Sequence, residues 1–331
     1  MSDVTNQPFY HLRPNKNIDR SLFLQTLMGL SRQLPISDYQ YTGFGSYLFD
    51  DFKLMHEELN ISKMVSLERD QTEFERAQFN LPYNCIAVQN VDSMEYLSDL
   101  SLGDNDHNIF WLDFVSPSEL GQQLADYATL LNVLNPNDIV RITLNANPSS
   151  LDKLNKSDNP DQLQIIRLQN LKERIPDEYF PPSLIWKDMT RAKYPLALLK
   201  ILRAITTQLL PDRPLLPNFM LPLFSTIYAD GQQMLTFTGI VLDKHKDEEL
   251  IKKALQRYSH NTFTWDEPWR IEIPSLSVRE LAAINKLLPN SNGRQQLLDT
   301  FPFIFSCRDP QIVDSYIAYY KYYPNYHQVN F

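Results

Sequence analysis

Residues 41–52, YTGFGSYLFDDF, place a Gly-x-Gly turn between an apolar approach and a run that can open a helix. After the turn, residues 49–59 carry apolar side chains at helical intervals, and residues 63–67 (KMVSL) form a short strand-like run. A strand, a glycine turn, a helix and a second strand are typical of the start of a parallel α/β sheet. The turn therefore raises the question of which ligand it could hold.

Three strand-like runs are each followed by a sequence that suits the start of a helix. The runs are residues 63–67, 85–88 and 109–112, and the capping sequences are DQTE at 70–73, DSME at 92–95 and SPSE at 116–119. In each, the first residue suits the N-cap, and the glutamate three positions later suits the reciprocal bond of a capping box. A chain that repeats strand, cap and helix predicts a parallel sheet, because parallel strands need a helix-length return.

The later sequence closes this pattern with a hairpin. One more strand is expected at residues 138–144, and residues 221–242 hold two apolar runs about Asp230-Gly231, a strong hairpin signal. Two further helices are expected, at residues 248–258 and at 277–288, where Ser277 and Glu280 suit a capping box. The predicted fold class is thus α/β, with a mostly parallel sheet and a C-terminal antiparallel hairpin.

The expected organisation is one core with additions. The predicted parts are an N-terminal helical segment at 1–38, a core at 39–147 and 218–243, a helical insertion at 148–217 that serves as a cap or substrate region, and a C-terminal helical addition with a Tyr-rich tail at 244–331.

Composition narrows the class of protein. The chain has 331 residues, 43% of them hydrophobic and 21% charged, which is typical of a folded soluble protein. Cys85 and Cys307 are too few for a disulfide framework or a cysteine zinc site, and residues 194–211, the most apolar stretch, contain Lys200 and Arg203. We therefore expect a cytoplasmic protein without membrane contact. The net charge of -9 disfavours nucleic acid as a partner, although a local basic patch is compatible with it.

The Gly-x-Gly turn lacks the marks of a phosphate-binding loop. No Gly-Lys-Ser/Thr follows it, and Leu48 and its neighbours stand where a dinucleotide fingerprint needs a third glycine. Asp50 and Asp51 follow at once, and two carboxylates are poor neighbours for a pyrophosphate. The turn therefore favours a ligand without phosphates, and a nicotinamide oxidoreductase is disfavoured.

The chain resembles the class I S-adenosylmethionine-dependent methyltransferases in four features that occur in the same order. They are the turn TGFGS, the acid that ends MVSLE, the acid in FWLDF and the late hairpin. The resemblance covers residues 39–144 and the hairpin, and it implies a Rossmann-like methyltransferase sheet with S-adenosylmethionine as cofactor. The order of SLFLQTL, YTGFGS, SLERD and FWLDF also resembles a little-characterised bacterial branch of O-methyltransferases.

The resemblance implies roles for particular residues. Those implied to bind the cofactor are Gly43, Phe44, Gly45, Glu68, Asp92 and Ser93. Glu68 would hydrogen-bond the ribose hydroxyls, Asp92 would lie near the adenine, and Asp113 would be the catalytic residue beside the transferred methyl group.

Each role has an alternative. The two glycines could serve only a strand-to-helix turn, Glu68 could be a surface acid, Asp92 a plain N-cap, and Asp113 a brace for its loop. His56 and His107 are further candidate bases whose alternative is a structural role. Asn145 and Asn147 are the only tempting partners for a metal, and we expect none, because neutral amides make weak ligands.

The methyl acceptor is not identified by the sequence. The Asn/Asp-Pro-Pro-aromatic signature of amino methyltransferases is absent after Asp113, so O-methylation is favoured over methylation of a base. Tyr41 and Thr42 stand where the turn of the family often begins with an acid. The main alternative is a methyltransferase-like scaffold that has lost turnover and serves as a binding subunit of an assembly.

Two regions suggest partners. From 167 to 203 there are eight Lys/Arg against four Asp/Glu, so Lys187, Arg191 and Lys193 could select an anionic acceptor, or could belong to a solvated helix face. The tail is dense in tyrosine, at 316, 319, 320, 322, 323 and 326. It could pack on the protein, stack bases, or form an interface with a protein partner or a second copy.

Overall fold

The structure is a computed structural model that describes residues 13–103, 106–152, 159–210, 218–243, 245–305 and 311–324. The chain forms two compact units. The core unit comprises Leu24–Ile227 and Gln232–Trp269, and the terminal unit comprises Met1–Phe23, Tyr228–Gly231 and Arg270–Phe331. All the candidate site residues fall in the core unit.

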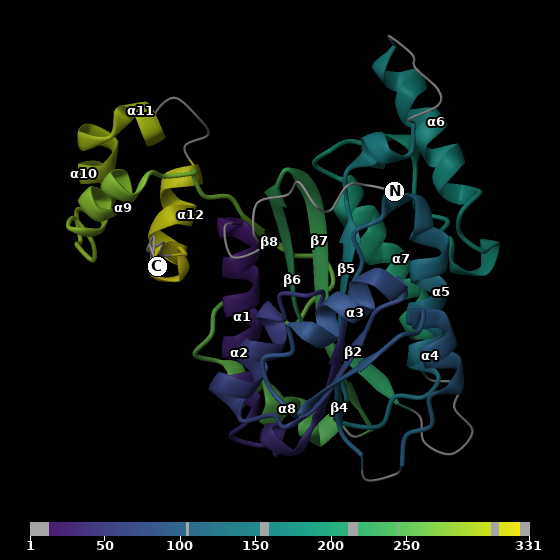
Figure 1. Cartoon of the computed structure of the whole chain (residues 1–331). Coiled ribbons are helices and arrows are strands. Elements are labelled where there is room, and N and C mark those ends of the chain that lie inside the picture. Colours follow the sequence, from purple (N-terminus) through teal and green to yellow (C-terminus); the bar gives the residue numbers. More distant parts are fainter. Residues whose placement is uncertain are drawn as a thin grey trace. The chain divides into compact units, whose positions relative to one another are not determined.

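Eight strands form one mixed sheet in the order β3-β2-β1-β4-β5-β7-β6-β8 (Figure 1). β1 to β5 are mutually parallel, and β7 is antiparallel to β5. The bounds are β1 Gln40–Gly43, β2 Lys63–Leu67, β3 Ile86–Gln89, β4 Asn108–Asp113, β5 Ile139–Asn145, β6 Phe219–Asp230, β7 Gln232–Leu242 and β8 Trp269–Ile271. The predicted fold class, a mostly parallel α/β sheet with a late hairpin, is therefore confirmed.

The helices connect and flank these strands. Their bounds are α1 Pro14–Leu30, α2 Asp50–Leu59, α3 Gln71–Phe79, α4 Ser93–Asp99, α5 Leu120–Leu131, α6 Pro160–Lys172, α7 Tyr194–Leu209, α8 His245–Leu255, α9 Val278–Asn285, α10 Gly293–Thr300, α11 Pro302–Phe305 and α12 Gln311–Tyr319. In the described part of the chain no helix combines the length and apolar character needed to span a membrane.

The predicted helix caps are confirmed in part. The Asp70 side chain accepts from the backbone N–H groups of Thr72 and Glu73, and Asp92 accepts from Met94. The capping box of α9 is complete between Ser277 and Glu280.

Two details of the predicted caps are wrong. The Asp70 N–H donates to the Glu68 carboxylate at 3.1 Å rather than to Glu73. Ser116 makes no cap bond; its hydroxyl lies 3.0 Å from the Ser118 hydroxyl, and a short 3-10 helix at Pro117–Glu119 precedes α5.

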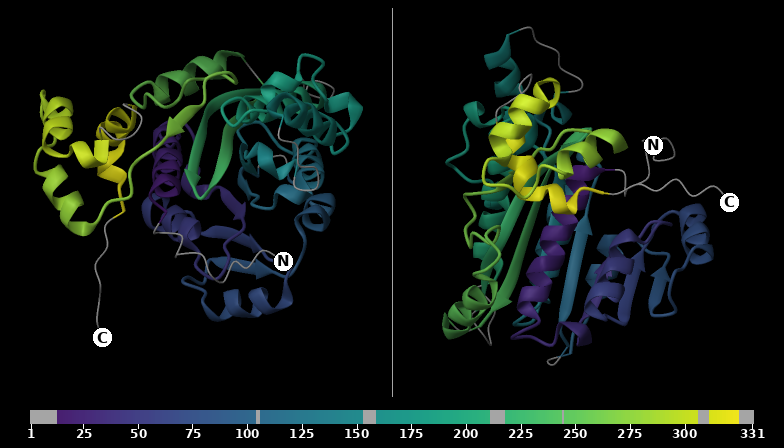
Figure 2. Two further views of the ribbon diagram at one scale, coloured as in Figure 1. Left: turned by 90° about the horizontal axis from the view of Figure 1, so that it is seen from above. Right: turned by 90° about the vertical axis from the view of Figure 1, so that its left-hand side faces the viewer.

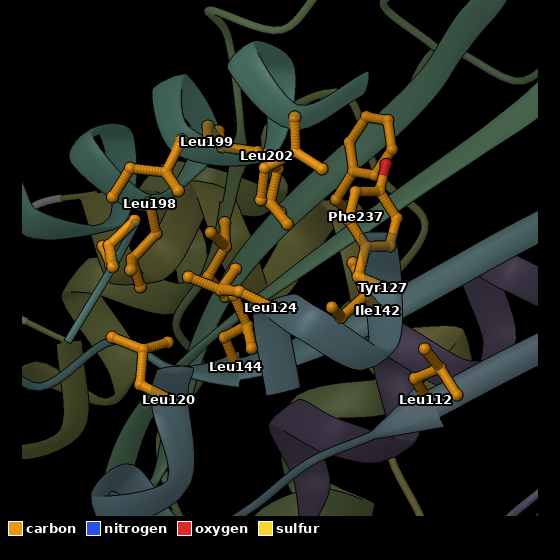
Figure 3. Packing of buried hydrophobic residues seen from close by; sticks show 14 of the residues in the cluster. Leu112, Leu120, Leu124, Tyr127, Ile142, Leu144, Leu198, Leu199, Leu202 and Phe237 are labelled. Atoms are coloured by element: carbon orange, nitrogen blue, oxygen red, sulfur yellow. The ribbon is translucent and has the colours of Figure 1, made fainter. Parts of the chain in front are cut away.

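Leucine-rich faces of α5 and α7 cover one side of the sheet. Figure 3 shows Leu124 and Tyr127 of α5 and Leu198 and Leu202 of α7 around the strand residues Leu112, Ile142, Leu144 and Phe237, all of them buried. The Tyr127 hydroxyl lies 2.8 Å from the Thr206 hydroxyl, so the polar end of this buried tyrosine has a hydrogen-bond partner. This core holds β4 and β5 rigidly, and with them the ends of both strands.

Strand order creates a switch point between β1 and β4. From β1 the chain runs outward through β2 to β3 and then returns to β4, on the other side of β1, before β5. The loops after β1 and β4 therefore leave in opposite directions, which is where open α/β sheets bind ligands. We call the edge where β1 to β5 end the carboxyl edge.

The insertion is helical. Residues 159–210 contain α6, two 3-10 turns and α7, and Figure 2 (right) shows the teal α6 extending beyond the sheet. The C-terminal addition is helical as well, with α8 in the core unit and α9 to α12 in the terminal unit.

In the terminal unit, Asp230 of the hairpin caps α1. Its carboxylate accepts from the backbone N–H groups of Asn15 at 3.2 Å and Lys16 at 2.8 Å. Gly231, at φ +110°, supplies the left-handed residue of the predicted turn. The hairpin tip therefore satisfies the amino end of a helix that lies more than 200 residues away in sequence.

The tyrosines of the tail pack inside the terminal unit where they are described. Tyr316 and Tyr323 are buried; the Tyr316 hydroxyl donates to Asn285, and the Tyr323 hydroxyl donates to the carbonyl of Pro274. Tyr326 and Cys307 lie outside the described residues. A partner or dimer interface at this tail stays a prediction.

Candidate functional site

Four of the predicted positions come together at the carboxyl edge. Gly43 is the last residue of β1, Glu68 follows β2, Asp92 lies three residues after β3, and Asp113 ends β4. These strands are consecutive neighbours in the sheet, so the four positions line one edge across the switch point. The parallel register brings them together although they span 71 positions of sequence.

The loop after β1 is held tightly against β2. The Gly45 N–H donates to the Ser66 hydroxyl at 3.0 Å, and a methyl group added at Gly45 would lie 2.7 Å from both that oxygen and the Phe49 ring. The left-handed conformations of the loop fall at Ser46 and Phe49, with φ of 48° and 53°, and not at the glycines. Gly45 is therefore required for close packing rather than for an unusual φ.

Phe44 packs beneath the carboxyl edge of the sheet, on the hydrophobic core. Its ring lies 5.5 Å from that of Phe114, which follows Asp113, and both rings pack on the hydrophobic core. The aromatic pair joins the loop after β1 to the loop after β4 across the switch point. The role predicted for Phe44 in cofactor binding stays a prediction.

Glu68 presents an acceptor at the end of β2. It is half-buried, one carboxylate oxygen accepts from the Asp70 N–H at 3.1 Å, and the other makes no hydrogen bond with a described residue. Burial raises the pKa of Glu68, against the lowering effect of that N–H, and the nearby carboxylates of Glu73 and Asp70 raise the pKa further. A carboxylate so placed can accept from a ligand hydroxyl.

Asp92 and Ser93 are committed to local structure at the end of β3. Besides capping α4, Asp92 lies 3.9 Å from the Arg69 guanidinium, which also donates to Glu119 at 3.1 Å. The Ser93 hydroxyl donates to Asp126 of α5 at 2.5 Å. Arg69 thus ties together the loops after β2, β3 and β4, a role that the sequence reading missed because it depends on contacts between loops.

Asp113 is positioned by its neighbour strand. It is half-buried and pairs in register with Thr143 of β5, whose carbonyl accepts from the Phe114 N–H at 3.1 Å. The Thr143 hydroxyl also accepts from the Trp111 indole at 3.1 Å. The backbone that carries Asp113 is therefore held against β5.

A polar interior behind Asp113 was also missed by the sequence reading. Arg141 is fully buried on β5; it donates to the Thr238 hydroxyl at 2.6 Å, and its guanidinium stacks 4.6 Å from the Trp111 ring. The signal in the sequence was the alternation of polar with apolar residues in IVRITLN, which marks one face of β5 as polar.

Asn145, which ends β5, and Asn147 use their side-chain oxygens in local hydrogen bonds. The Asn145 side-chain oxygen accepts from the Asn147 N–H at 3.0 Å, and the Asn147 oxygen accepts from both the N–H and the hydroxyl of Ser149. Among the described residues, no group of three or more His, Cys, Asp and Glu side chains is arranged to hold a metal ion.

The two candidate histidines lie away from this edge. His56, near the end of α2, has its Nδ1 2.9 Å from the carbonyl of Ile61, and His107 precedes β4 and stacks on Tyr39 at 5.2 Å. Both sit toward the amino ends of the strands, so the structure does not bring either of them to Asp113.

The residues at the edge fit S-adenosylmethionine chemically. A loop that excludes a side chain at Gly45 allows a close approach of backbone, and Glu68 keeps an oxygen for a ribose hydroxyl. Asp113 adds negative charge to the edge, which suits a cationic sulfonium and repels phosphates. The fit therefore agrees with the phosphate-free ligand expected from the turn.

Fold and edge together define a Rossmann-like sheet of the class I methyltransferase type. Residues 8–331 match the model of the family described as "Putative O-methyltransferase", and the chain belongs to that family. The family match confirms the resemblance to methyltransferases and supports S-adenosylmethionine as the cofactor. No curated protein matches the chain.

Several solved structures are similar to parts of the chain. The N-methyltransferase NodS from Bradyrhizobium japonicum has 9% identity and a TM-score of 0.39, covering 68% of this chain and 97% of that one. A "putative O-methyltransferase" from Klebsiella pneumoniae has 11% identity and a TM-score of 0.34, covering 71% and 91%. An S-adenosylmethionine-dependent methyltransferase from Mesorhizobium loti has 15% identity and a TM-score of 0.27, covering 36% of this chain and 52% of that one.

Proposed function

We propose that this protein is an S-adenosylmethionine-dependent methyltransferase that methylates a hydroxyl oxygen of its acceptor. The observation that carries the proposal is the meeting of the Gly45 loop, Glu68 and Asp113 at the switch point, in a chain of the O-methyltransferase family. On the grounds of cysteine content and family resemblance, we place the activity in a bacterial cytoplasm.

In this proposal each residue at the edge has a separate task. The loop at Gly43–Gly45 brings backbone close to the cofactor, Glu68 accepts from the ribose hydroxyls, and Asp92 lies beside the adenine. The bound cofactor would supply an electrophilic methyl group and leave as a neutral thioether, because the bond between that methyl carbon and sulfur breaks with its electron pair on sulfur. Asp113 accepts the proton that the acceptor hydroxyl loses as its oxygen forms the new bond to the methyl carbon.

The positioning of Asp113 supports its role. Methyl transfer is an in-line displacement, so the protein gains most by aligning the acceptor oxygen. The strand pairing with Thr143 fixes the backbone on which Asp113 is carried. A hydroxyl acceptor is favoured over a base because Phe-Val-Ser follows Asp113 in place of the proline platform of amino methyltransferases.

Calorimetric titration with S-adenosylmethionine and S-adenosylhomocysteine tests the cofactor site. We expect micromolar binding of both ligands to the wild type and at least a tenfold loss in Glu68→Ala, because the ribose hydroxyls lose their acceptor. Glu95→Ala, an exposed acid on α4, is the matched control and should bind as the wild type does.

The same titration separates the two functional hypotheses. Absence of binding to either ligand would contradict the proposal and favour the catalytically silent scaffold. If binding is found, a trideuteromethyl-labelled cofactor incubated with small hydroxyl compounds should transfer its label in the wild type. Asp113→Asn should bind the cofactor and transfer the label much more slowly.

A further inference from the structure

Six of the eight basic residues between 167 and 203 fall into two groups with different surroundings. Three of them are bonded to other residues of the core unit. Arg167 forms an ion pair with Asp152 at 2.6 Å, Arg174 donates to the carbonyl of Pro117 at 3.1 Å, and Arg203 lies 3.5 Å from Asp266. Each side chain of this first group therefore has a partner within the folded protein.

Lys187, Arg191 and Lys193 form the second group, which we call the basic segment. All three are exposed, and none makes an ion pair with a described acidic residue. Asp188, the one acid between residues 187 and 193, accepts a hydrogen bond from the Ile185 N–H at 3.1 Å. Residues 187–193 therefore carry three cations against one carboxylate, and none of the cations forms an ion pair with a described acid.

Lys187 lies 5.3 Å from the ring of its neighbour Trp186, but the charge of Lys193 does not stabilise the helix that it precedes. Lys193 is the N-cap of α7, and the first turn of α7 contains no acidic residue. Cations are unfavourable at the amino end of a helix, where the peptide dipoles already place positive charge. The charge of Lys193 is therefore unfavourable for folding by itself, and an anion bound nearby would offset this cost.

The basic segment is anchored beside the end of β5. The Gln233 side chain donates to the carbonyls of both Arg191, at 2.8 Å, and Ala146, at 2.9 Å. Ala146 lies three residues beyond Thr143, the register partner of Asp113, a distance of about 10 Å along a strand. The basic segment thus lies on the β5 side of Asp113, whereas Gly45, Glu68 and Asp92 lie on its other side.

We propose that the basic segment binds an anionic group, carboxylate or phosphate, on the methyl acceptor, and so selects acidic hydroxyl compounds as substrates. This inference rests on the proposed function, because it assigns the acceptor side of the same edge. Arg191 offers the planar fork that pairs with such a group, and the two lysines add charge. The acceptor would then span from Asp113 to the basic segment while the cofactor occupies the opposite side.

Binding of matched probes tests the inference without a need for turnover. The neutral probe is 4-hydroxybenzamide, and the anionic probes are 4-hydroxybenzoate and 4-hydroxyphenyl phosphate, which distinguish the two kinds of anion. Each is titrated into protein saturated with S-adenosylhomocysteine. The test variant is Lys187→Glu/Arg191→Glu/Lys193→Glu, and the control, Arg32→Glu/Lys63→Glu/Lys253→Glu, makes the same change in net charge at exposed positions elsewhere.

We expect the wild type and the control variant to bind at least one anionic probe more tightly than the amide. In the test variant this preference should fall about tenfold, equivalent to about 1.4 kcal/mol, with S-adenosylhomocysteine binding unchanged. The preference should also weaken as salt is raised, because the charges are exposed.

Equal binding of all probes to the wild type would overturn the inference, as would a preference that persists in the test variant. Loss of the preference in both variants would also overturn it, because net charge and not the basic segment would then be responsible. Failure of S-adenosylhomocysteine to bind the wild type would contradict the proposed function instead, and the same probes titrated into the free protein would still report on the basic segment.

Discussion

Gly45 is the residue at which the loop after β1 accepts no side chain. Gly45→Ala should destabilise the protein by about 1–3 kcal/mol, because its new methyl group would lie 2.7 Å from Phe49 and Ser66. Gly43→Ala is the comparison, since its nearest contacts are at 3.2 Å and 3.3 Å and smaller shifts relieve them. Urea denaturation measures both. A Gly45→Ala variant no less stable than Gly43→Ala would contradict the packing explanation.

Glu68 should make cofactor binding depend on pH. Burial raises the pKa of Glu68 above its ordinary value of 4.5, and only the carboxylate form offers both oxygens as acceptors. Cofactor affinity should therefore rise with pH through a window above 4.5 and then level off. A raised pKa in the folded state also means that Glu68 costs stability as pH rises through the same window.

Titrations of affinity against pH check this expectation, with Glu68→Gln as the matched variant. The variant should bind weakly with little dependence on pH in that window. An identical pH profile in Glu68→Gln and wild type would assign the titration to another group.

At the scale of elements, Asp230 is the cap of α1. Asp230→Ala should lower the free energy of unfolding by about 2 kcal/mol, because the N–H groups of Asn15 and Lys16 lose their acceptor. Asp299→Ala, on the surface of α10 in the same unit, should change it by about 0.5 kcal/mol or less. Urea midpoints compare the two, and equal midpoints would show that the cap contributes nothing.

The ion pair between Arg167 of α6 and Asp152 makes a contribution to stability that can be measured. Arg167→Met should cost about 2 kcal/mol, because the ion pair with Asp152 is largely buried, with 14% and 11% of the two side chains exposed. Arg203→Met should cost under about 1 kcal/mol, because its pair with Asp266 is 52% and 66% exposed. Denaturation of both variants measures the difference, and a cost at Arg203 as large as that at Arg167 would contradict this ranking.

Local sequence predicted most elements of the core and fewer of their contacts. The runs at 63–67 and 109–112 became β2 and most of β4 because their apolar residues suit a buried parallel strand. The cap expected at Ser116 failed because its hydroxyl meets Ser118 instead, and side-chain rotamers of this kind are not fixed by residue type.

At the scale of the whole molecule, ligand protection should follow the carboxyl edge. Saturation with S-adenosylhomocysteine should slow hydrogen exchange in residues 43–49, 68–70, 90–93 and 113–116, because these loops converge at the switch point. Hydrogen exchange with mass spectrometry measures this, and the amides of α9 and α10 are the internal control. Protection confined to α9 and α10 would move the ligand site away from the carboxyl edge.

The sequence predicted where the candidate site residues lie in the sheet, but it did not predict most of their side-chain contacts. Glu68 follows β2 and Asp113 ends β4, and both strands were expected to be parallel, so their place at one edge of the sheet was foreseeable. The contacts of Arg69, and the burial of Arg141 behind Asp113, were not foreseeable, because they join loops or strands that no local pattern relates.

The sequence by itself determined the elements: apolar periodicity set the strands and helices, Asp70, Asp92 and Ser277 set helix starts, and Asp230-Gly231 set the hairpin. These signals act over a few residues, so a single chain displays them. Only the tertiary structure decided that Ser66 holds Gly45, that Asp230 caps α1 and that Gln233 anchors the basic segment beside β5. Those bonds join residues 21 to 214 positions apart, and they form only when packing of the sheet brings the partners within hydrogen-bonding distance.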